Sequence, residues 1–325
     1  MAELRYNPLI GDWVMIASHR QNRPQMPKDW CPFCPGEGKN VQDYDVLEYD
    51  NDFPALMLEP PMPDDVARGE LFKTAPAAGK CEVILYSPKH TITLPELPLT
   101  HITKLVRLWQ ERFTALSREE KIKYVFLFEN RGDVVGVTMP HPHGQIYGYS
   151  WVPLRVKRKL ENSAAYFTKN GRCIYCDILK EEMADGRRIV FENSHFVGYL
   201  PFWTDYPYGI SLQPKQHITN INDFTEDQTK SFAEALKYAS GTLDALYNKP
   251  FPYMMCLYNA PVDGGDHGKH WHFHIEFFPP MRSDTKQKFN ASSETGAWAA
   301  CNPTAPEEKA AELREAYARF VKNAK

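Results

Sequence analysis

The chain has 325 residues, of which 43% are hydrophobic and 24% charged, and its 38 Lys and Arg against 41 Asp and Glu give a formal net charge of −3. This balance excludes a protein whose function is to coat nucleic acid, and the longest apolar runs are too short for a transmembrane helix. The opening MAELRYNPLIGDWVMI has an early Glu and no cationic lead into an apolar stretch, so it does not predict a signal peptide, and we expect a cytoplasmic protein with no membrane or nucleic-acid partner.

The first half of the chain presents a definite order of elements. It begins with a Cys31-Pro-Phe-Cys34 loop, a strand-like segment over 49–58 and the strand-like EVILYSPKH, which ends at His90. A helix follows, for which Thr100 can serve as the N-cap and in which apolar residues recur at helical spacing. A strand over 123–130, a glycine-containing loop and His141-Pro-His143 complete this half.

The second half repeats that order. Cys173-Ile-Tyr-Cys176 is followed by strand-like 188–202, by GISLQPKQH ending at His217, and by a helix that Thr225 and Gln228 open with a capping box. A strand over 253–260 and a glycine-rich loop lead to His272-Phe-His274. The repetition predicts two related domains, 1–153 and 154–325, the second ending in a helix. Short strands between tight turns favour antiparallel sheets with packed helices, an α+β fold.

The cysteines indicate metal rather than disulfides. The chain has seven, an odd number, and four of them form the two Cys-x-x-Cys pairs. Structural zinc takes four ligands in a tetrahedron, and each repeat offers two cysteines and two histidines at corresponding positions. We therefore predict two zinc sites, formed by Cys31, Cys34, His90 and His141 and by Cys173, Cys176, His217 and His272.

His143 is left over once the first tetrahedron is complete. Alternate residues of an extended chain share a face, so His143 lies beside a metal-anchored His141, and its neutral imidazole suits nucleophilic catalysis. Gln145, two residues on, can donate a hydrogen bond to a phosphoryl oxygen. Arg20 and Arg23 carry guanidinium groups suited to phosphate, and glycines in the loop from Asn130 to Thr138 let main-chain N–H groups approach an anion.

These motifs together resemble a known family. HPHGQ, preceded by Asn130 and Gly136-Val-Thr138, is similar to the active-site signature of the galactose-1-phosphate uridylyltransferases, a branch of the histidine triad superfamily. The resemblance covers nearly the whole chain, through RYNPLIGDWVMIASHRQNRP, CPFCPG, NDFPAL, SPKHTITLPELP and HWHFH. It implies two tandem histidine-triad-like domains, the first catalytic and the second silent.

The resemblance also implies a reaction. His143 would take the uridylyl group of UDP-glucose as a covalent intermediate and pass it to galactose 1-phosphate, a step of galactose metabolism (the Leloir pathway), with Gln145 bonded to the transferred group. The substrate contacts that it implies are Arg20, Arg23, Asn51, Asp52, Phe53, Asn130, Gly136, Thr138, Lys288, Phe289 and Glu294. In the family the segment of Lys288 and Phe289 reaches the site from a partner subunit, which implies a homodimer.

The chain departs from the family at its second metal site. One branch holds iron there with a glutamate and three histidines, whereas this chain has Lys159 and Tyr258 at two of the positions. His274 is the repeat's counterpart of His143, but Ile-Glu follows it instead of Gly-Gln, and the carboxylate of Glu276 would repel phosphate.

Three alternatives remain open on the sequence. One is a related nucleotide-sugar phosphorylase or adenylyltransferase of the same superfamily, which uses the same histidine with adenine and inorganic phosphate. The second is a zinc hydrolase in which His141 and His143 both bind a catalytic metal and water attacks. The third is a zinc-stabilised binding module without chemistry.

Overall fold

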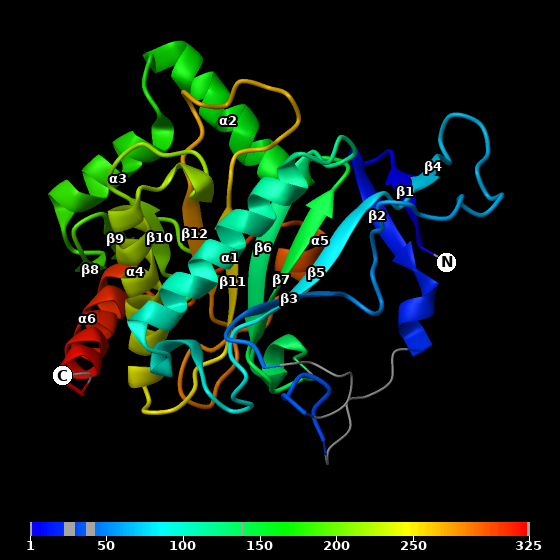
Figure 1. Cartoon of the computed structure of the whole chain (residues 1–325). Coiled ribbons are helices and arrows are strands. Elements are labelled where there is room, and N and C mark those ends of the chain that lie inside the picture. The colour runs from blue at the N-terminus through cyan, green and yellow to red at the C-terminus, as the bar shows by residue number, and fades with distance from the viewer. Residues whose placement is uncertain (1, 23–29, 37–42, 138, 324–325) are drawn as a thin grey trace.

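The computed structural model describes residues 2–22, 30–36, 43–137 and 139–323, and a nine-stranded sheet forms its centre (Figure 1). In spatial order the strands are β3 (Leu47–Asp50), β5 (Gly79–Leu85), β7 (His143–Tyr149), β6 (Tyr124–Arg131), β11 (Tyr253–Tyr258), β12 (His274–Phe278), β10 (Ser211–Pro214), β9 (Phe196–Tyr199) and β8 (Ile189–Glu192). A separate three-stranded sheet has the order β2 (Asp12–Ala17), β1 (Ala2–Asn7) and β4 (Thr74–Pro76).

The two halves of the chain share the large sheet. The first half supplies β3, β5, β7 and β6, and the second supplies β11, β12, β10, β9 and β8. They join where β6 pairs with β11, with Phe128 opposite Cys256. Every ladder between named strands in the described residues is antiparallel, which confirms the predicted α+β class.

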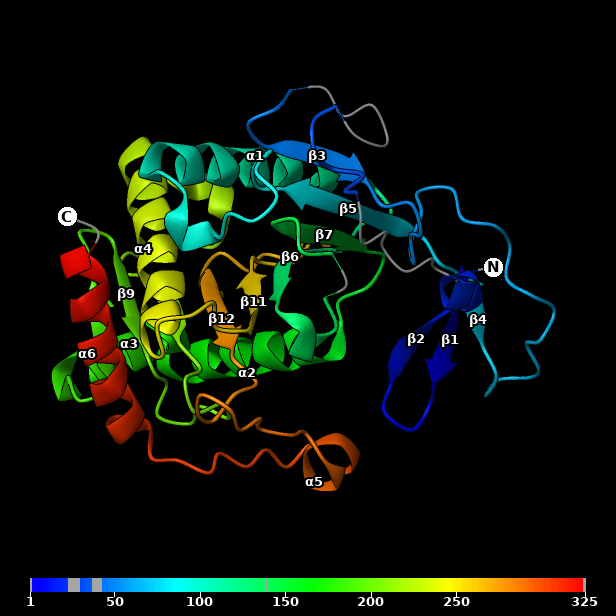
Figure 2. The ribbon, with the colours of Figure 1, turned by 90° about the horizontal axis from the view of Figure 1, so that it is seen from below.

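Helices cover both faces of this sheet. They are α1 (Leu99–Ser117), α2 (Leu154–Asn170), α3 (Ile174–Asp185), α4 (Glu226–Ala245), α5 (Ser292–Gly296) and α6 (Pro306–Asn323), and the short 3₁₀ helices are η1 (Ser18–Asn22), η2 (Leu94–Glu96), η3 (Asp133–Val135) and η4 (Ile221–Asp223). Figure 2 shows α1 and α2 on opposite sides of the central strands. The described helices are too short or too polar to cross a lipid bilayer.

Of the two N-caps predicted from the sequence, the structure confirms one and contradicts the other. Thr225 opens α4 as predicted, because its hydroxyl accepts from the Gln228 N–H at 3.2 Å and its own N–H donates to the Gln228 side chain at 2.8 Å. The prediction for Thr100 is wrong. Pro98 is the N-cap of α1, and its carbonyl accepts from the N–H groups of His101 and Ile102. Pro98 itself is extended, with a φ of −57° and a ψ of 146°, as an N-cap residue is.

Strand β7 shows how the fold separates core from site. Ile146 is fully buried in the core between the sheet and helices α1 and α4. The side chains of His143 and Gln145 point to the opposite face, since neighbouring residues of a strand alternate, and both are half-buried. The chemistry-bearing residues therefore lie on the sheet face that α1 and α4 leave uncovered.

Candidate active site and metal centres

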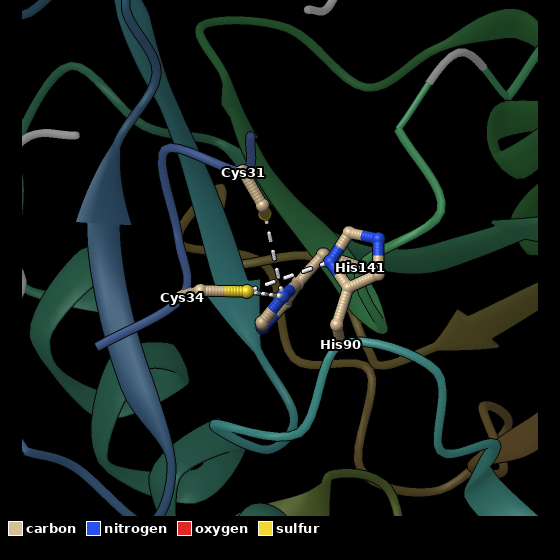
Figure 3. A group of neighbouring side chains, drawn as sticks. All are labelled: Cys31, Cys34, His90 and His141. Carbon is tan, nitrogen blue, oxygen red and sulfur yellow. Dashed lines mark hydrogen bonds between the residues drawn. The ribbon is translucent and has the colours of Figure 1, made fainter. Parts of the chain in front are cut away.

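Four side chains of the first half meet beside the start of β7. Cys31 and Cys34 come from the loop before β3, His90 from the loop after β5, and His141 from the segment that leads into β7 (Figure 3). Their ligand atoms all lie within 4.8 Å of one another. The sulfur of Cys34 is 3.5 Å from Nδ1 of His90 and 3.7 Å from Nδ1 of His141, which is also 3.6 Å from the sulfur of Cys31. Tetrahedral zinc with ordinary bond lengths separates sulfur and nitrogen ligands by about 3.5 Å, so this set fits the ion.

The ring of His141 is oriented by its other nitrogen. Nε2 donates to the main-chain oxygen of Ser87 at 2.8 Å and lies 2.9 Å from the hydroxyl of Tyr44. Burial lowers the pKa of His141 to about 4, so the ring is neutral at pH 7. The proton is then on Nε2 and the lone pair of Nδ1 faces the two sulfurs, which is the tautomer a metal ligand needs.

The second half builds the same arrangement from the corresponding positions. The ligand atoms of Cys173, Cys176, His217 and His272 also lie within 4.8 Å of one another. The sulfur of Cys176 is 3.3 Å from Nδ1 of His217 and 3.4 Å from Nδ1 of His272. The Nε2 atoms of these rings donate to the main-chain oxygens of Gly268 and Pro214, so this group fits a tetrahedral ion equally well.

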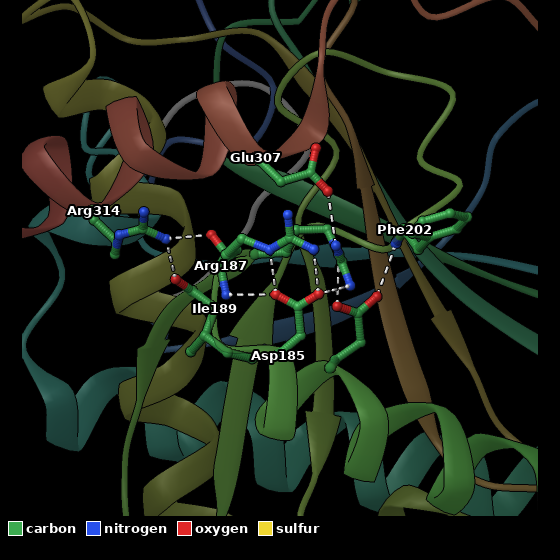
Figure 4. Close-up of polar contacts among 8 residues, drawn as sticks. Asp185, Arg187, Ile189, Phe202, Glu307 and Arg314 are labelled. Atoms are coloured by element: carbon green, nitrogen blue, oxygen red, sulfur yellow. Dashed lines mark hydrogen bonds and ion pairs between the residues drawn. The ribbon is translucent and has the colours of Figure 1, made fainter.

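An ion-pair network anchors helix α3, whose N-terminal end carries the two cysteines of this second group. Arg188 is 5% exposed and pairs with Glu182 of α3 and with Glu307 of α6, each at 2.7 Å. Arg314 of α6 donates to the main-chain oxygens of Arg187 and Ile189 in the same region (Figure 4). The C-terminal helix, which the sequence predicts, thus packs on the body of the second half.

His143 is the first residue of β7 and stands next to the first metal group. Its Nδ1–H donates to the main-chain oxygen of His141 at 2.8 Å. This bond assigns the proton to Nδ1 and the lone pair to Nε2. A ligand histidine and the neighbouring imidazole are therefore linked through one carbonyl group, so anchoring the first ring orients the second.

Gln145 lies on the same strand face and is oriented by Tyr147. The hydroxyl of Tyr147 donates to the amide oxygen of Gln145 at 3.4 Å, a long contact that leaves the amide nitrogen as the group able to donate onward. Burial raises the pKa of Tyr147, and the positive charge of Arg20 opposes that rise. Arg20 belongs to η1 and is near enough for its charge to act on Tyr147, which lies on the same strand face as His143 and Gln145.

The segment that follows edge strand β3 forms a tight turn. The side-chain oxygen of Asn51 accepts the N–H of Phe53 at 2.9 Å, and Asp52 accepts from the hydroxyl of Tyr49 at 2.6 Å. Nε2 of His19 lies 3.1 Å from the main-chain oxygen of Pro54, which ties this turn to η1. Asn51, Asp52 and Phe53, which the resemblance implies as substrate contacts, therefore adjoin the short helix that carries Arg20.

The predicted phosphate loop is partly described. Asn130 lies in β6. Phe128 of this strand pairs with Gln145 of β7, so Asn130, two residues further along, is at the level of His143. Gly136 ends η3 with a φ of +80°, a left-handed conformation that glycine accepts readily. Arg23 and Thr138 lie outside the described residues, so the predictions for these two positions stay predictions.

The three predicted residues near the C-terminus follow strand β12, and two of them border a cavity. Lys288 is 7% exposed and its ammonium lies 3.1 Å from the side-chain oxygen of Asn290, whereas Phe289 is 71% exposed. Glu294 belongs to α5. Lys288 and Glu294 border a cavity of about 910 Å³ whose walls include strands β11 and β12, helix α2 and the segment 288–300.

The second-half counterpart of His143 has a similar backbone contact but different surroundings. Nδ1 of His274 donates to the main-chain oxygen of His272 at 2.8 Å, the distance found in the first half. Its Nε2, however, lies 2.9 Å from the ammonium of Lys159, which also pairs with Glu276 at 2.9 Å. The ring of Tyr258 stacks on His274 with centroids 4.7 Å apart.

Sequence reasoning missed the residues that orient the site. Tyr44, Tyr147 and His19 were not predicted to take part. Tyr147 could have been predicted from the sequence, because it continues the alternation of His143 and Gln145 along one strand face. Tyr44 and His19 had none, since their partners lie 97 and 35 residues away in the chain.

Comparison with known proteins agrees with this geometry. Residues 1–153 match the family model described as galactose-1-phosphate uridyl transferase, N-terminal domain, and residues 159–319 match that of the C-terminal domain. The chain belongs to the galactose-1-phosphate uridylyltransferase family. It is 40% identical to the galactose-1-phosphate uridylyltransferase of Thermotoga maritima, over 97% of this chain and 98% of that relative.

Solved structures of uridylyltransferases extend the comparison to the fold. One superposes with a TM-score of 0.90 at 32% identity and covers 98% of this chain and 99% of that one. An ADP-glucose phosphorylase from Arabidopsis thaliana, solved with bound ADP-glucose, superposes with a TM-score of 0.73 at 25% identity over 97% of this chain and 99% of that one. The chain is an enzyme of the uridylyltransferase class.

Proposed function

We propose that this enzyme exchanges a uridylyl group between UDP-glucose and galactose 1-phosphate through a covalent intermediate on His143. The bond from Nδ1–H of His143 to the oxygen of His141, at 2.8 Å, carries the proposal. It directs the lone pair of a neutral imidazole onto Nε2, where a nucleophile for phosphorus is needed. The names of the relatives support the choice of the uridylyl group and of galactose 1-phosphate.

The reaction then takes two balanced steps. Nε2 of His143 attacks the α-phosphorus of UDP-glucose, an N–P bond forms, and the bond from that phosphorus to the bridging oxygen breaks, so glucose 1-phosphate leaves. A phosphate oxygen of galactose 1-phosphate next attacks the same phosphorus and the N–P bond breaks, which gives UDP-galactose and regenerates the imidazole. The carbonyl of His141 stabilises the positive charge on the ring during both steps, and the amide nitrogen of Gln145 donates to the phosphoryl oxygens.

Zinc is the ion that we assign to both Cys2His2 groups. The sulfur–nitrogen distances of 3.3 to 3.7 Å and the histidine tautomers support a tetrahedral ion of this kind. With four protein ligands in each group, bound zinc supplies rigidity rather than an open coordination position. In the first half that rigidity reaches His143 through the backbone of His141.

The remaining assignments rest on the resemblance to the family. We assign catalysis to residues 1–153 and a silent role to residues 154–325, in a cytoplasmic homodimer. The substrate contacts that we propose are Arg20, Arg23, Asn51, Asp52, Phe53, Asn130, Gly136, Thr138, Lys288, Phe289 and Glu294. The lowering influence of Arg20 on the pKa of Tyr147 supports the first of these.

The decisive experiment is to incubate the protein separately with UDP-glucose and with ADP-glucose and to measure its intact mass. We expect a uridylyl adduct, which peptide mapping assigns to His143. His143→Asn should form no adduct and should keep its zinc. His274→Asn, which changes the matching position of the repeat, should still form the adduct.

Two results would favour the alternatives. An adenylyl adduct with ADP-glucose and none with UDP-glucose would favour a phosphorylase like the Arabidopsis structural relative. Loss of one zinc from His143→Asn, measured by metal analysis, would favour a hydrolase in which this histidine binds the ion.

A further inference from the structure

Each of the two Cys-x-x-Cys loops has one main-chain oxygen that accepts a hydrogen bond from a side chain elsewhere in the chain. In the first half it is the oxygen of Phe33, the residue before Cys34, and in the second half it is the oxygen of Tyr175, the residue before Cys176. A peptide group is planar, so a bond that holds this oxygen also holds the main-chain nitrogen of the following cysteine. The side chain that donates to it therefore helps to place a sulfur ligand.

Tyr44 makes this contact in the first half. Its hydroxyl donates to the oxygen of Phe33 at 2.9 Å. The hydroxyl oxygen also lies 2.9 Å from Nε2 of His141 and 3.1 Å from the main-chain oxygen of Ser87. Since Nε2 of His141 carries a proton, it can share that proton between Ser87 and Tyr44, and the phenol donates its own proton to Phe33. One hydroxyl group thus connects the ring of a histidine ligand with the cysteine loop.

Packing holds the ring of Tyr44 in place. The phenol is half-buried and packs against an apolar cluster that includes Phe33, Val83, Leu85 and Met139. A tyrosine has only two side-chain torsions, so a packed ring fixes its hydroxyl at a low cost in conformational entropy. Tyr44→Phe removes the oxygen and should leave this packing intact.

Gln213 makes the corresponding contact in the second half. It lies in β10 and is 1% exposed. Its amide nitrogen donates to the oxygen of Tyr175 at 3.1 Å and lies 3.5 Å from Nδ1 of His272, while its amide oxygen accepts from the hydroxyl of Tyr199 at 3.1 Å. The oxygen of the next residue, Pro214, accepts from Nε2 of His272 at 3.1 Å. The glutamine side chain therefore joins the second cysteine loop to the strand that orients a histidine ligand.

The two halves reach this arrangement from different places in the fold. Tyr44 precedes β3, whereas Gln213 lies in β10, whose counterpart in the repeat is β5. The two donors are thus a phenol and an amide at positions that do not correspond, and both are directed at the same carbonyl of the repeated loop. Burying a polar side chain has a cost unless it is hydrogen-bonded, and in each half the bond goes to the metal group.

We propose that Tyr44 and Gln213 are positioning residues, each of which fastens a Cys-x-x-Cys loop to the histidine side of its metal group so that the group retains its zinc. In the first half the effect extends to His143, because Tyr44 holds the ring of His141 and the carbonyl of His141 holds His143. This inference rests on the assignment of zinc made with the proposed function. It adds the residues that hold the two ligand sets closed.

The rate at which each group loses zinc tests the proposal. The zinc-loaded full chain is mixed with excess chelator and iodoacetamide, and peptide mapping follows the alkylation of Cys34 and of Cys176 separately, since bound zinc protects its thiolates. We expect Tyr44→Phe to speed alkylation of Cys34 about tenfold and to leave Cys176 unchanged, and Gln213→Met to do the reverse. Asp45→Asn is the control, because it removes an exposed ion pair with Lys104 beside Tyr44.

Uridylyl labelling at full zinc loading tests the extension to His143. Labelling should slow at least about threefold in Tyr44→Phe and should not change in Gln213→Met. An unchanged labelling rate in Tyr44→Phe would overturn this extension. The thermal midpoint of each zinc-loaded variant shows whether it is folded, and Tyr44→Phe alone decides the question if Gln213→Met does not fold.

The alkylation rates also separate this inference from the proposed function. Rates in Tyr44→Phe and Gln213→Met equal to those of the wild type overturn the proposal, and so does an acceleration in Asp45→Asn as large as that in Tyr44→Phe. If wild-type protein holds no zinc, the assignment of zinc fails first. Alkylation does not depend on uridylyl transfer, so the test of zinc retention stays valid even if no uridylyl adduct forms.

Discussion

The ammonium group of Lys159 lies 2.9 Å from Nε2 of His274, the imidazole that corresponds in the repeat to His143. Burial first, and Lys159 second, lower the pKa of His274 to about 3, so the ring is neutral and accepts this hydrogen bond. The bond engages the lone pair that an imidazole needs to attack phosphorus. One lysine thus accounts physically for the silence that we propose for the second half.

Replacing Lys159 tests how much the pairing of its ammonium group with the carboxylate of Glu276 contributes to stability. Burial alone would raise the pKa of Glu276, but Lys159, His274 and Arg155 together lower it to about 2, so the carboxylate is charged. Lys159→Met leaves that charge largely without its partner, and we expect a loss of about 3 kcal/mol in the free energy of unfolding. Urea titration measures it. Lys159→Met with Glu276→Met should recover most of the loss, and a double variant as unstable as the single one would contradict this explanation.

The two metal groups should differ in their effect on catalysis. Cys34→Ser and Cys176→Ser each remove one sulfur ligand, and we expect each variant to lose one zinc by metal analysis. Only the first group contains His141, whose carbonyl holds His143. Uridylyl labelling of His143 should therefore slow at least about tenfold in Cys34→Ser. Cys176→Ser is the matched control. Equal slowing in the two variants would contradict the proposal that the first metal group orients His143 through the carbonyl of His141.

Gly144 must be a glycine because of what lies beneath it. A Cβ at this position would lie 2.3 Å from the hydroxyl oxygen of Tyr86, a fully buried side chain. Gly144→Ala should therefore displace the strand between His143 and Gln145 and slow uridylyl labelling by about 10- to 100-fold.

A second substitution checks that explanation for Gly144. Tyr86→Phe removes the oxygen in conflict, so the double variant with Gly144→Ala should regain part of the labelling rate. Recovery should be partial, because the main-chain oxygen of Phe128 would still lie 3.1 Å from the new Cβ. A double variant no faster than Gly144→Ala alone would show that Tyr86 is not the obstacle.

Glu129 gives the stability a pH dependence. Burial raises the pKa of this carboxyl from 4.5 to about 7, although Arg131 and two tyrosines oppose the rise. The folded protein then binds more protons than the unfolded chain between these two values, so stability falls as the pH rises through that window. The decline attributable to Glu129 is about 3 kcal/mol. Glu129→Gln should abolish it in urea titrations from pH 4.5 to 8. The exposed Glu120→Gln is the control, and an unaltered slope in Glu129→Gln would disprove the assignment.

Much of the site was accessible before the fold was known. The Cys-x-x-Cys pairs and the His-x-His motifs carry their chemistry in local spacing, and their repetition identified both ligand sets, which the structure brings together. The capping box of Thr225 was readable because both of its partners lie within one turn. The N-cap of α1 could not be predicted in the same way. Proline has no side-chain hydrogen-bond acceptor, so Pro98 acts as a cap through its backbone alone.

Sequence by itself determined the fold class and the two Cys2His2 groups, and it led to the proposal of His143 as the nucleophile, because each depends on residues whose spacing in the chain controls their geometry. Only the tertiary structure decided how the two halves share one sheet, which carbonyl orients each histidine, that Lys159 reaches His274 across 115 positions, and that Tyr44 joins a cysteine loop to His141. Those features depend on contacts between segments far apart in the chain. Such contacts are selected by the packing of the whole domain, and no local pattern encodes them.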